Sequence, residues 1–163
     1  MNPSPNRGLS LQAYDGTDVP NSIDPDPTPG QVALARQGCG MLLYAVKQLG
    51  PATGRYNCHG LVFASRRTNI PPVGMAKVVD IDDLLQRDDC APVSGPPQVG
   101  DIAVYRSSRG TVEHTGYVCR LETMGTASIV FVWSMWGGLG EFEHRVDQSP
   151  YHDCSIEYWR LRP

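Results

Sequence analysis

The sequence has no long apolar run, and it begins without the pattern of a secretory signal. A membrane-spanning helix needs roughly 20 consecutive apolar residues, and no stretch of the 163-residue chain approaches that length. The opening M-N-P-S-P-N-R-G lacks the basic and then apolar order of a signal peptide. We therefore expect no membrane span, and the compartment stays open between the cytoplasm and export by another route.

An excess of charge of one sign is also missing. The formal net charge is −3, which is small and has the wrong sign for attraction to a phosphate backbone. Residues 1–30 contain four aspartates and one arginine, so they account for the whole imbalance and residues 31–163 are neutral. We expect no nucleic-acid partner.

Paired cysteine motifs are absent as well. The chain has five cysteines, an odd number, and no C-x-x-C motif, so we expect reduced thiols rather than a disulfide framework. His152, Asp153 and Cys154 are adjacent in sequence, but no second pair of ligands completes a zinc site. We expect neither a metal nor a cofactor.

Glycine and proline are abundant, with 17 and 14 residues, which predicts many loops and short elements rather than a helical bundle. With 40% apolar residues the chain can bury a core, and its length fits one domain. Residues 1–27 contain five prolines and no apolar period. We predict a disordered or extended leader there, with few contacts, and Leu9, Leu11 and Tyr14 are the candidates for docking it on the domain. A single domain over residues 28–163 follows.

Within that domain, helical patterns come first and β-rich patterns follow. Thr28 and Gln31 have capping-box spacing, and an apolar stripe with helical spacing continues to Leu49. Helices followed by consecutive strands predict an α+β fold with an antiparallel sheet. The predicted helices cover 28–49, 58–67 with Asn57 as its cap, and 80–85, where Asp80 with Asp83 three residues later has the spacing of a capped helix start. The β-rich stretches cover 101–106, 112–121, 128–134, 141–146 and 155–161.

Cys58 is the first candidate for chemistry, because it lies where the second helix is predicted to begin. A thiol in the first turn of a helix meets unpaired backbone N–H groups and the positive end of the helix dipole. Both favour the nucleophilic thiolate. Gly60 would let another segment of the chain or a substrate backbone approach closely. The alternative is a buried structural cysteine, which is common for this residue type.

His114 is the second candidate, on a predicted strand. Strand alternation places His114, Gly116 and Val118 on one face. A histidine beside a glycine on the same face has open space next to its ring, which suits a general base. The alternative is a histidine whose nitrogens are satisfied by a neighbour in the sheet.

Ser134 is the candidate for orienting that histidine, as in other nucleophile–base–orienter sets. It is the one polar side chain in the apolar stretch 129–137, and it lies on the strand that follows the His114 strand. The alternative is a serine at a strand end that bonds to the backbone. Glu141, Glu143 and His144, just downstream, are rivals for the role.

Three segments of the chain form a set: N-C-H-G-L-V at 57–62, Q-V-G-D-I-A-V-Y at 98–105 and E-H-T-G-Y-V at 113–118. They resemble motifs of the NlpC/P60 cysteine peptidases. The first is similar to the D-C-S-G-L-V nucleophile motif of that family, and the second is similar to P-x-x-G-D-L-V-F-F. E-H-T-G-Y-V at 113–118 is similar to the H-V-G-I-Y strand that holds their catalytic histidine. The three segments follow the family's order within residues 31–135.

The resemblance implies a papain-like α+β fold in which N-terminal helices pack on a small antiparallel sheet. It implies hydrolysis or transfer at an amide bond through an acyl-enzyme, often on peptidoglycan peptides. Cys58 then corresponds to the nucleophile and His114 to the general base, and Ser134 stands where the family has its third polar residue. Asn57 and His59 replace the aspartate and serine of the nucleophile motif.

From these residues we expect a thiol hydrolase that acts on a peptide or amide substrate. Two alternatives stay open: an acyltransferase or deamidase that uses the same dyad, and a binding module on a papain-like fold that has lost its activity. Alkylation of Cys58 separates the enzymes from the binding module, because a site without activity needs no thiol of low pKa.

Overall fold

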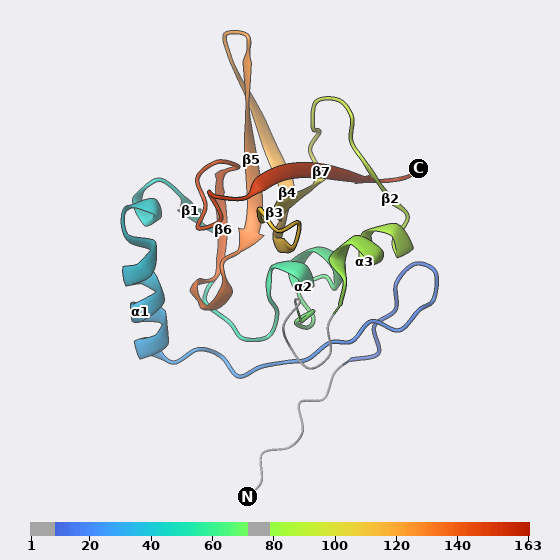
Figure 1. Ribbon diagram of the computed structural model, residues 1–163. Coiled ribbons are helices and arrows are strands. Elements are labelled where there is room, and N and C mark those ends of the chain that lie inside the picture. The colour runs from blue at the N-terminus through green and yellow to red at the C-terminus, as the bar shows by residue number, and fades with distance from the viewer. Residues whose placement is uncertain (1–8, 72–78) are drawn as a thin grey trace, which may run out of the picture.

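The computed structural model describes residues 9–71 and 79–163 of the chain, which form a seven-stranded sheet surrounded by short helices (Figure 1). The strands are β1 (Lys47–Gln48), β2 (Cys90–Pro92), β3 (Ile102–Arg106), β4 (Val112–Met124), β5 (Ala127–Met135), β6 (Glu141–Arg145) and β7 (Ser155–Leu161). The helices are α1 (Pro29–Cys39), α2 (Cys58–Phe63) and α3 (Ile81–Arg87), and the 3-10 helices are η1 (Gly40–Tyr44) and η2 (Gly137–Leu139).

The strand order in the sheet is β1-β6-β5-β4-β3-β7-β2, and every neighbouring pair is antiparallel. Strands β3 to β6 are neighbours both along the chain and in the sheet, whereas β7 returns to lie between β3 and β2. The expected α+β class with an antiparallel sheet is confirmed, and each of the five β-rich stretches contains one strand. Strands β1 and β2 were missed because they are too short to show an alternating pattern.

One face of the sheet is covered by α2 and α3, and we call it the α2 face. Ile102 and Val104 of β3 belong to the same buried cluster as Val62 of α2 and Leu85 of α3. Tyr117 of β4 also points to this side, because its hydroxyl donates a hydrogen bond to the carbonyl oxygen of Val62 at 2.7 Å. Most of the core lies between this face and the two helices.

The opposite face has its own buried cluster, and we call it the aromatic face. Tyr105 of β3, Val118 of β4 and Val132 of β5 point to this side, and Tyr151 and Ile156 pack against them. Because neighbouring residues of a strand point to opposite faces, Tyr105 lies on this face while Val104 lies on the α2 face.

Helix α1 begins as predicted and ends earlier. Gln31 N donates to the Thr28 hydroxyl at 3.4 Å, and Thr28 N donates to the Gln31 side chain at 2.8 Å, which completes the capping box. The helix ends at Cys39 because Gly40 takes a left-handed φ of 51°. The predicted helix over 28–49 is therefore wrong beyond Cys39. The glycine stops it there, and η1 and β1 follow.

Helices α2 and α3 have the caps expected from the sequence. Asn57 caps α2 and Asp80 caps α3. Helix α2 ends at Phe63 rather than at residue 67, because Ser65 and Arg66 take left-handed φ angles of 48° and 64°. Among the described residues, no helix combines the length and the apolar character needed to cross a membrane.

The leader packs more closely than predicted. Within its described part, residues 9–27, Leu11, Ala13 and Val19 are buried in the core of the α2 face. Ser22 pairs with Asn69 in an isolated β-bridge. The prediction of few contacts is wrong for these residues, because an irregular segment can bury side chains without any apolar period. Residues 1–8 lie outside the described part of the chain.

Candidate functional site

Cys58 occupies the first turn of α2, as the sequence predicts. The side-chain oxygen of Asn57 accepts hydrogen bonds from Gly60 N at 2.8 Å and from Ile70 N at 3.1 Å. The Asn57 amide in turn donates to the carbonyl oxygen of Ile70 at 2.7 Å. One asparagine therefore caps α2 and ties its start to the segment after it, which fixes the position of Cys58 on the α2 face.

The surroundings of the thiol favour its protonated form. Cys58 is buried beside Leu61 and Met135, with Trp133 at the edge of the cluster. Burial raises the pKa of the thiol to about 11, although the backbone N–H groups and the Thr115 hydroxyl near the sulfur act in the opposite direction. The expected thiolate is not favoured here, because desolvation outweighs the N–H groups of the helix start.

His59 follows the cysteine and is also buried. Its Nδ1 atom lies 3.0 Å from the Thr115 hydroxyl oxygen, while its Nε2 atom has no hydrogen-bond partner among the described residues. Burial lowers the pKa of His59 to about 4, so the ring is neutral at pH 7. Thr115 thus contacts both Cys58 and His59 from β4.

His114 lies on the other side of the sheet. It is paired across strands with Tyr105, and the two rings make an edge contact at 5.2 Å. The Tyr151 ring stacks on the imidazole at 4.1 Å with an interplanar angle of 12°. Burial first, and then His144 and His59, hold the pKa of His114 well below its usual value. Within the described part of the chain, neither ring nitrogen has a hydrogen-bond partner.

The expected contact between Cys58 and His114 is therefore wrong in this structure. Thr115 and Tyr117 of β4 contact α2, so alternation turns His114 to the aromatic face. The predicted alternation within β4 is right, with Val118 on the aromatic face. What the pattern could not give is the face on which α2 packs, and α2 packs on the face opposite to the imidazole.

Ser134 does not orient His114. It shares the aromatic face but is bonded elsewhere: Trp136 Nε1 donates to its hydroxyl oxygen at 3.0 Å. The hydroxyl can then donate its own hydrogen to His144 Nε2, 2.8 Å away. His144 Nδ1 lies 2.7 Å from the carbonyl oxygen of Arg145 and donates to it. This chain fixes one neutral tautomer of His144, which was one of the rivals for the third role.

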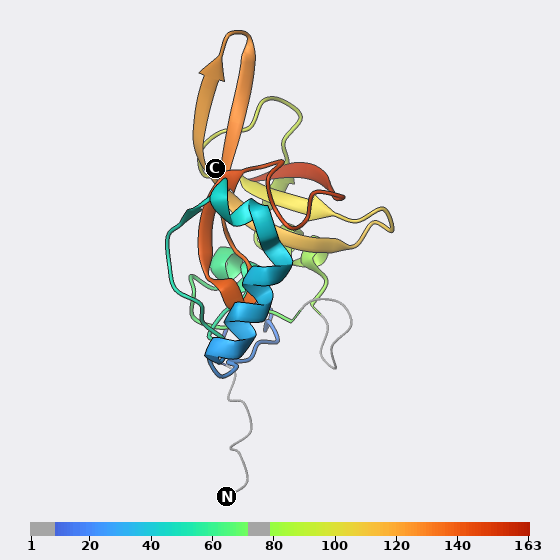
Figure 2. The same cartoon turned by 90° about the vertical axis from the view of Figure 1, so that its left-hand side faces the viewer.

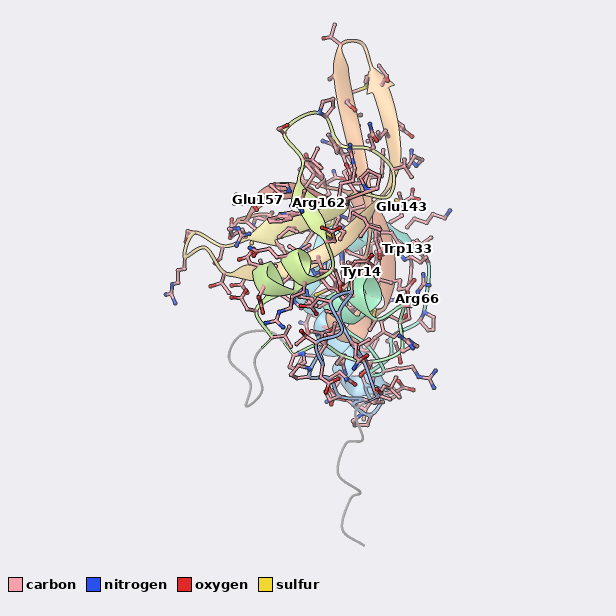
Figure 3. All side chains as sticks on the ribbon, turned by 90° about the vertical axis from the view of Figure 1, so that its right-hand side faces the viewer. Tyr14, Arg66, Trp133, Glu143, Glu157 and Arg162 are labelled. Atoms are coloured by element: carbon pink, nitrogen blue, oxygen red, sulfur yellow. The ribbon has the colours of Figure 1, made fainter. Side chains whose placement is uncertain are left out.

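The sequence analysis missed a polar cluster around Glu141, next to Cys58. The buried carboxylate accepts hydrogen bonds from Tyr56 Oη at 2.5 Å, Arg66 Nε at 2.6 Å and Trp133 Nε1 at 2.8 Å. The Arg66 guanidinium also stacks over Trp133, 4.2 Å from the ring centre, and both lie beside α2 in Figure 3. We call these four residues the Glu141 cluster. Tyr56 and Trp133 also pack against Cys58.

The Glu141 cluster joins the segments before and after α2 to β5 and β6. Burial first, and then Glu141, raise the pKa of Tyr56 to about 12. Arg66 reaches the carboxylate from a left-handed backbone conformation, which costs a non-glycine residue about 1 kcal/mol or more. No local sequence signal could find this cluster, because Arg66 and Glu141 are 75 positions apart. Glu143, the other carboxylate considered, is bonded to Arg120 instead.

A cavity of about 480 Å³ lies at the start of α2. It is bordered by the leader, α1, the segment before α2, and η2. Its polar side chains are Asp24, Asp26, Gln31, Thr53, Tyr56, Asn57 and Asn69. Because Asn57, the cap of α2, lines this cavity, a ligand bound there would lie beside the N-terminal end of the helix.

Within residues 9–71 and 79–163, no three His, Cys, Asp or Glu side chains are grouped to hold a metal ion. All five cysteines are free. Comparisons with protein-family models, with curated proteins and with solved structures find no match to this chain. The function must therefore be argued from the site alone.

Proposed function

We propose that this chain is a binding module on a papain-like scaffold, with a cysteine and a histidine that do not form a catalytic dyad. The observation that carries the proposal is the placement of Cys58 on the α2 face and His114 on the aromatic face. A general base must lie within hydrogen-bond reach of the group it deprotonates, directly or through one water. Here the thiol keeps its proton at neutral pH, because burial raises its pKa to about 11.

The cavity at the start of α2 supports a polar ligand with positive charge. Among the described residues, its lining includes Asp24 and Asp26 and no lysine, arginine or histidine. The Thr53 hydroxyl and Gly54 N donate to Asp26 at 2.7 and 2.9 Å, which holds the pKa of that carboxyl below its usual value. Arg55, just outside the lining, lies close enough to Asp26 to contribute to lowering its pKa. A charged carboxylate facing a cavity favours a cationic partner. A peptide with an arginine or lysine side chain fits this chemistry.

The ligand is tested by calorimetric titration with a short arginine-containing peptide and with the same peptide carrying glutamate instead. We expect binding of the first alone, and weaker binding after Asp26→Asn. Asp153→Asn is the matched control, because Asp153 is exposed and outside the cavity lining. Equal binding of both peptides, or no effect of Asp26→Asn, would contradict the ligand assignment. Neither result would bear on catalysis, which is tested separately by labelling the thiol.

The absence of a dyad is tested on the thiol itself. Iodoacetamide labelling at about pH 6, followed by mass spectrometry of the labelled peptides, should show Cys58 reacting no faster than Cys90, because burial raises the pKa of both thiols to about 11. His114→Ala should leave the rate unchanged. Fast labelling of Cys58 that is lost on His114→Ala would overturn the proposal, because it would require an adjacent imidazole.

A thiol hydrolase stays the second candidate, with Cys58 as nucleophile and an amide or peptide bond as substrate. What favours it is the set of backbone N–H groups of Thr115, His59 and Cys58 near the sulfur, which are donors of the kind that stabilise an oxyanion. The imidazole of His114, whose nitrogens have no hydrogen-bond partner in the described part of the chain, belongs to the residue next to Thr115. This reading requires a second arrangement of β4 that brings the ring to the α2 face, and the labelling experiment detects it.

A further inference from the structure

The hairpin of β4 and β5 extends beyond the rest of the sheet. Figures 1 and 2 show it projecting from the body of the molecule as two strands alone. The pairing of β4 with β3 reaches Tyr117, and Val118 bonds to Gly100 and Asp101 just before β3. The pairing of β5 with β6 begins at Phe131, and Val130 bonds to Val146 just after β6. A β-bulge at Cys119 marks the point where the hairpin leaves the sheet. Beyond it, residues 120–124 pair with β5, and within the described part of the chain they pair with no other strand.

The outer edge of β4 therefore presents unpaired backbone groups over residues 119–124. Leu121 and Met124 are exposed on this segment. A strand edge of this kind is a template for another strand, and a hairpin of two strands is marginally stable alone in water. Residues 119–130 contain neither proline nor lysine, which many proteins place at such edges to prevent pairing. A further strand that pairs along this edge would therefore stabilise the hairpin.

The side chains on this edge are arranged so that two antiparallel copies of it place opposite charges next to each other. In an antiparallel pair of two copies centred on Leu121, Arg120 stands opposite the partner's Glu122, and Glu122 stands opposite the partner's Arg120. Leu121 then meets the partner's Leu121. Opposite charges in cross-strand positions stabilise a sheet and like charges destabilise it. The outer edge of β5 lacks this feature, because residues 127–130 carry no charge.

We propose that the chain forms a two-fold symmetric dimer through the outer edge of β4, residues 119–124. The two hairpins then make one four-stranded antiparallel sheet. The contact is of the kind in which the same surface is used by both copies, which is the commonest symmetry of soluble oligomers. Within one copy Arg120 already contacts Glu122 and Glu143, so these charges are ordered before the second copy arrives.

Exchanging the two charges tests the proposal by analytical ultracentrifugation under reducing conditions over a range of protein concentration. We expect the unmodified chain to dimerise. Arg120→Glu or Glu122→Arg alone should raise the dimer dissociation constant by about tenfold, because two cross-strand pairs become repulsive. The double variant Arg120→Glu/Glu122→Arg should dimerise like the unmodified chain. An equimolar mixture of the two single variants should form a heterodimer, because their edges are complementary.

The control is Arg87→Glu, which reverses one charge of an exposed ion pair on α3, away from the hairpin. It should leave the dissociation constant unchanged, and circular dichroism should show that every variant is folded. A chain that stays monomeric at all concentrations would overturn the proposal. So would a dimer that neither single variant weakens, because that dimer would use another surface.

Discussion

The two faces of the sheet hold the two halves of the expected dyad in very different surroundings. On the α2 face, the groups near Cys58 are tied into hydrogen bonds: Glu141 accepts from three side chains, and Thr115 bonds to His59. On the aromatic face, His114 makes ring contacts with Tyr105 and Tyr151, and its nitrogens have no hydrogen-bond partner among the described residues. Residues that are neighbours on one strand therefore need not belong to one site. Thr115 lies in the hydrogen-bonded surroundings of Cys58, whereas His114, one position earlier, lies among stacked aromatic rings on the opposite face.

Lowering the pH should have the largest effect on the free energy of unfolding, because buried neutral histidines lie on both faces. Burial lowers the pKa of His59 and of His144 to about 4 from the usual 6.5. The unfolded chain therefore takes up protons as the pH falls below 6.5, while the folded chain takes them up only near pH 4. The free energy of unfolding should fall across this window by about 3 kcal/mol for each of the two histidines.

Urea unfolding at pH 7, 5.5 and 4 measures this loss. His114→Phe should make the decrease shallower, because the pKa of His114 is also lowered by burial and the phenyl ring takes up no proton. Unchanged stability between pH 7 and pH 5 would contradict the burial of these rings in solution.

Removing the carboxylate of the α2 face should have the next largest effect. Glu141→Ala leaves Arg66, Tyr56 and Trp133 without their shared acceptor and should lower the free energy of unfolding by about 3 kcal/mol. Glu143→Ala is the control, because that carboxylate pairs with the partly exposed Arg120 and should cost less than about 1 kcal/mol. Equal losses of unfolding free energy in chemical denaturation would show that the Glu141 cluster stabilises the fold no more than the ion pair of Glu143 does.

The smallest effect is expected on the aromatic face. His114→Phe keeps the stacking on Tyr151 and removes two nitrogens that have no partner among the described residues. It should change stability at pH 7 by less than about 1 kcal/mol, in either direction. His59→Phe removes the contact with Thr115 and should cost about 2 kcal/mol. If thermal unfolding shows a larger loss for His114→Phe than for His59→Phe, hydrogen bonding on the α2 face contributes less to stability than ring stacking on the aromatic face.

Local features of the fold could be predicted from the sequence, because they depend on residues close together in the chain. The caps at Thr28, Asn57 and Asp80 are confirmed, and so are the strands with alternating patterns. The end of α1 was missed because the apolar stripe continues past Gly40, and its spacing does not show that this glycine takes a positive φ. Helix propensity sums over a window, whereas a left-handed glycine ends a helix at one position.

The candidate site could be predicted only in part. The place of Cys58 depends on its neighbour Asn57 and was right. The place of His114 relative to it depends on which face of β4 meets α2, and an alternating pattern has the same appearance for either face. The role of Ser134 depends on Trp136 and His144, whose approach is a property of the folded sheet.

The position of β7 has a consequence for the order in which the chain can fold during synthesis. β7 follows every other strand in the sequence, yet it lies between β3 and β2 and pairs Ile102 with Trp159 and Cys90 with Leu161. While the ribosome still holds residues 155–161, both partner strands remain open edges, and such edges pair with whatever strand is near. The gap between β3 and β2 therefore stays open until β7 has been synthesised, and open strand edges of this kind favour association between neighbouring nascent chains on one messenger RNA.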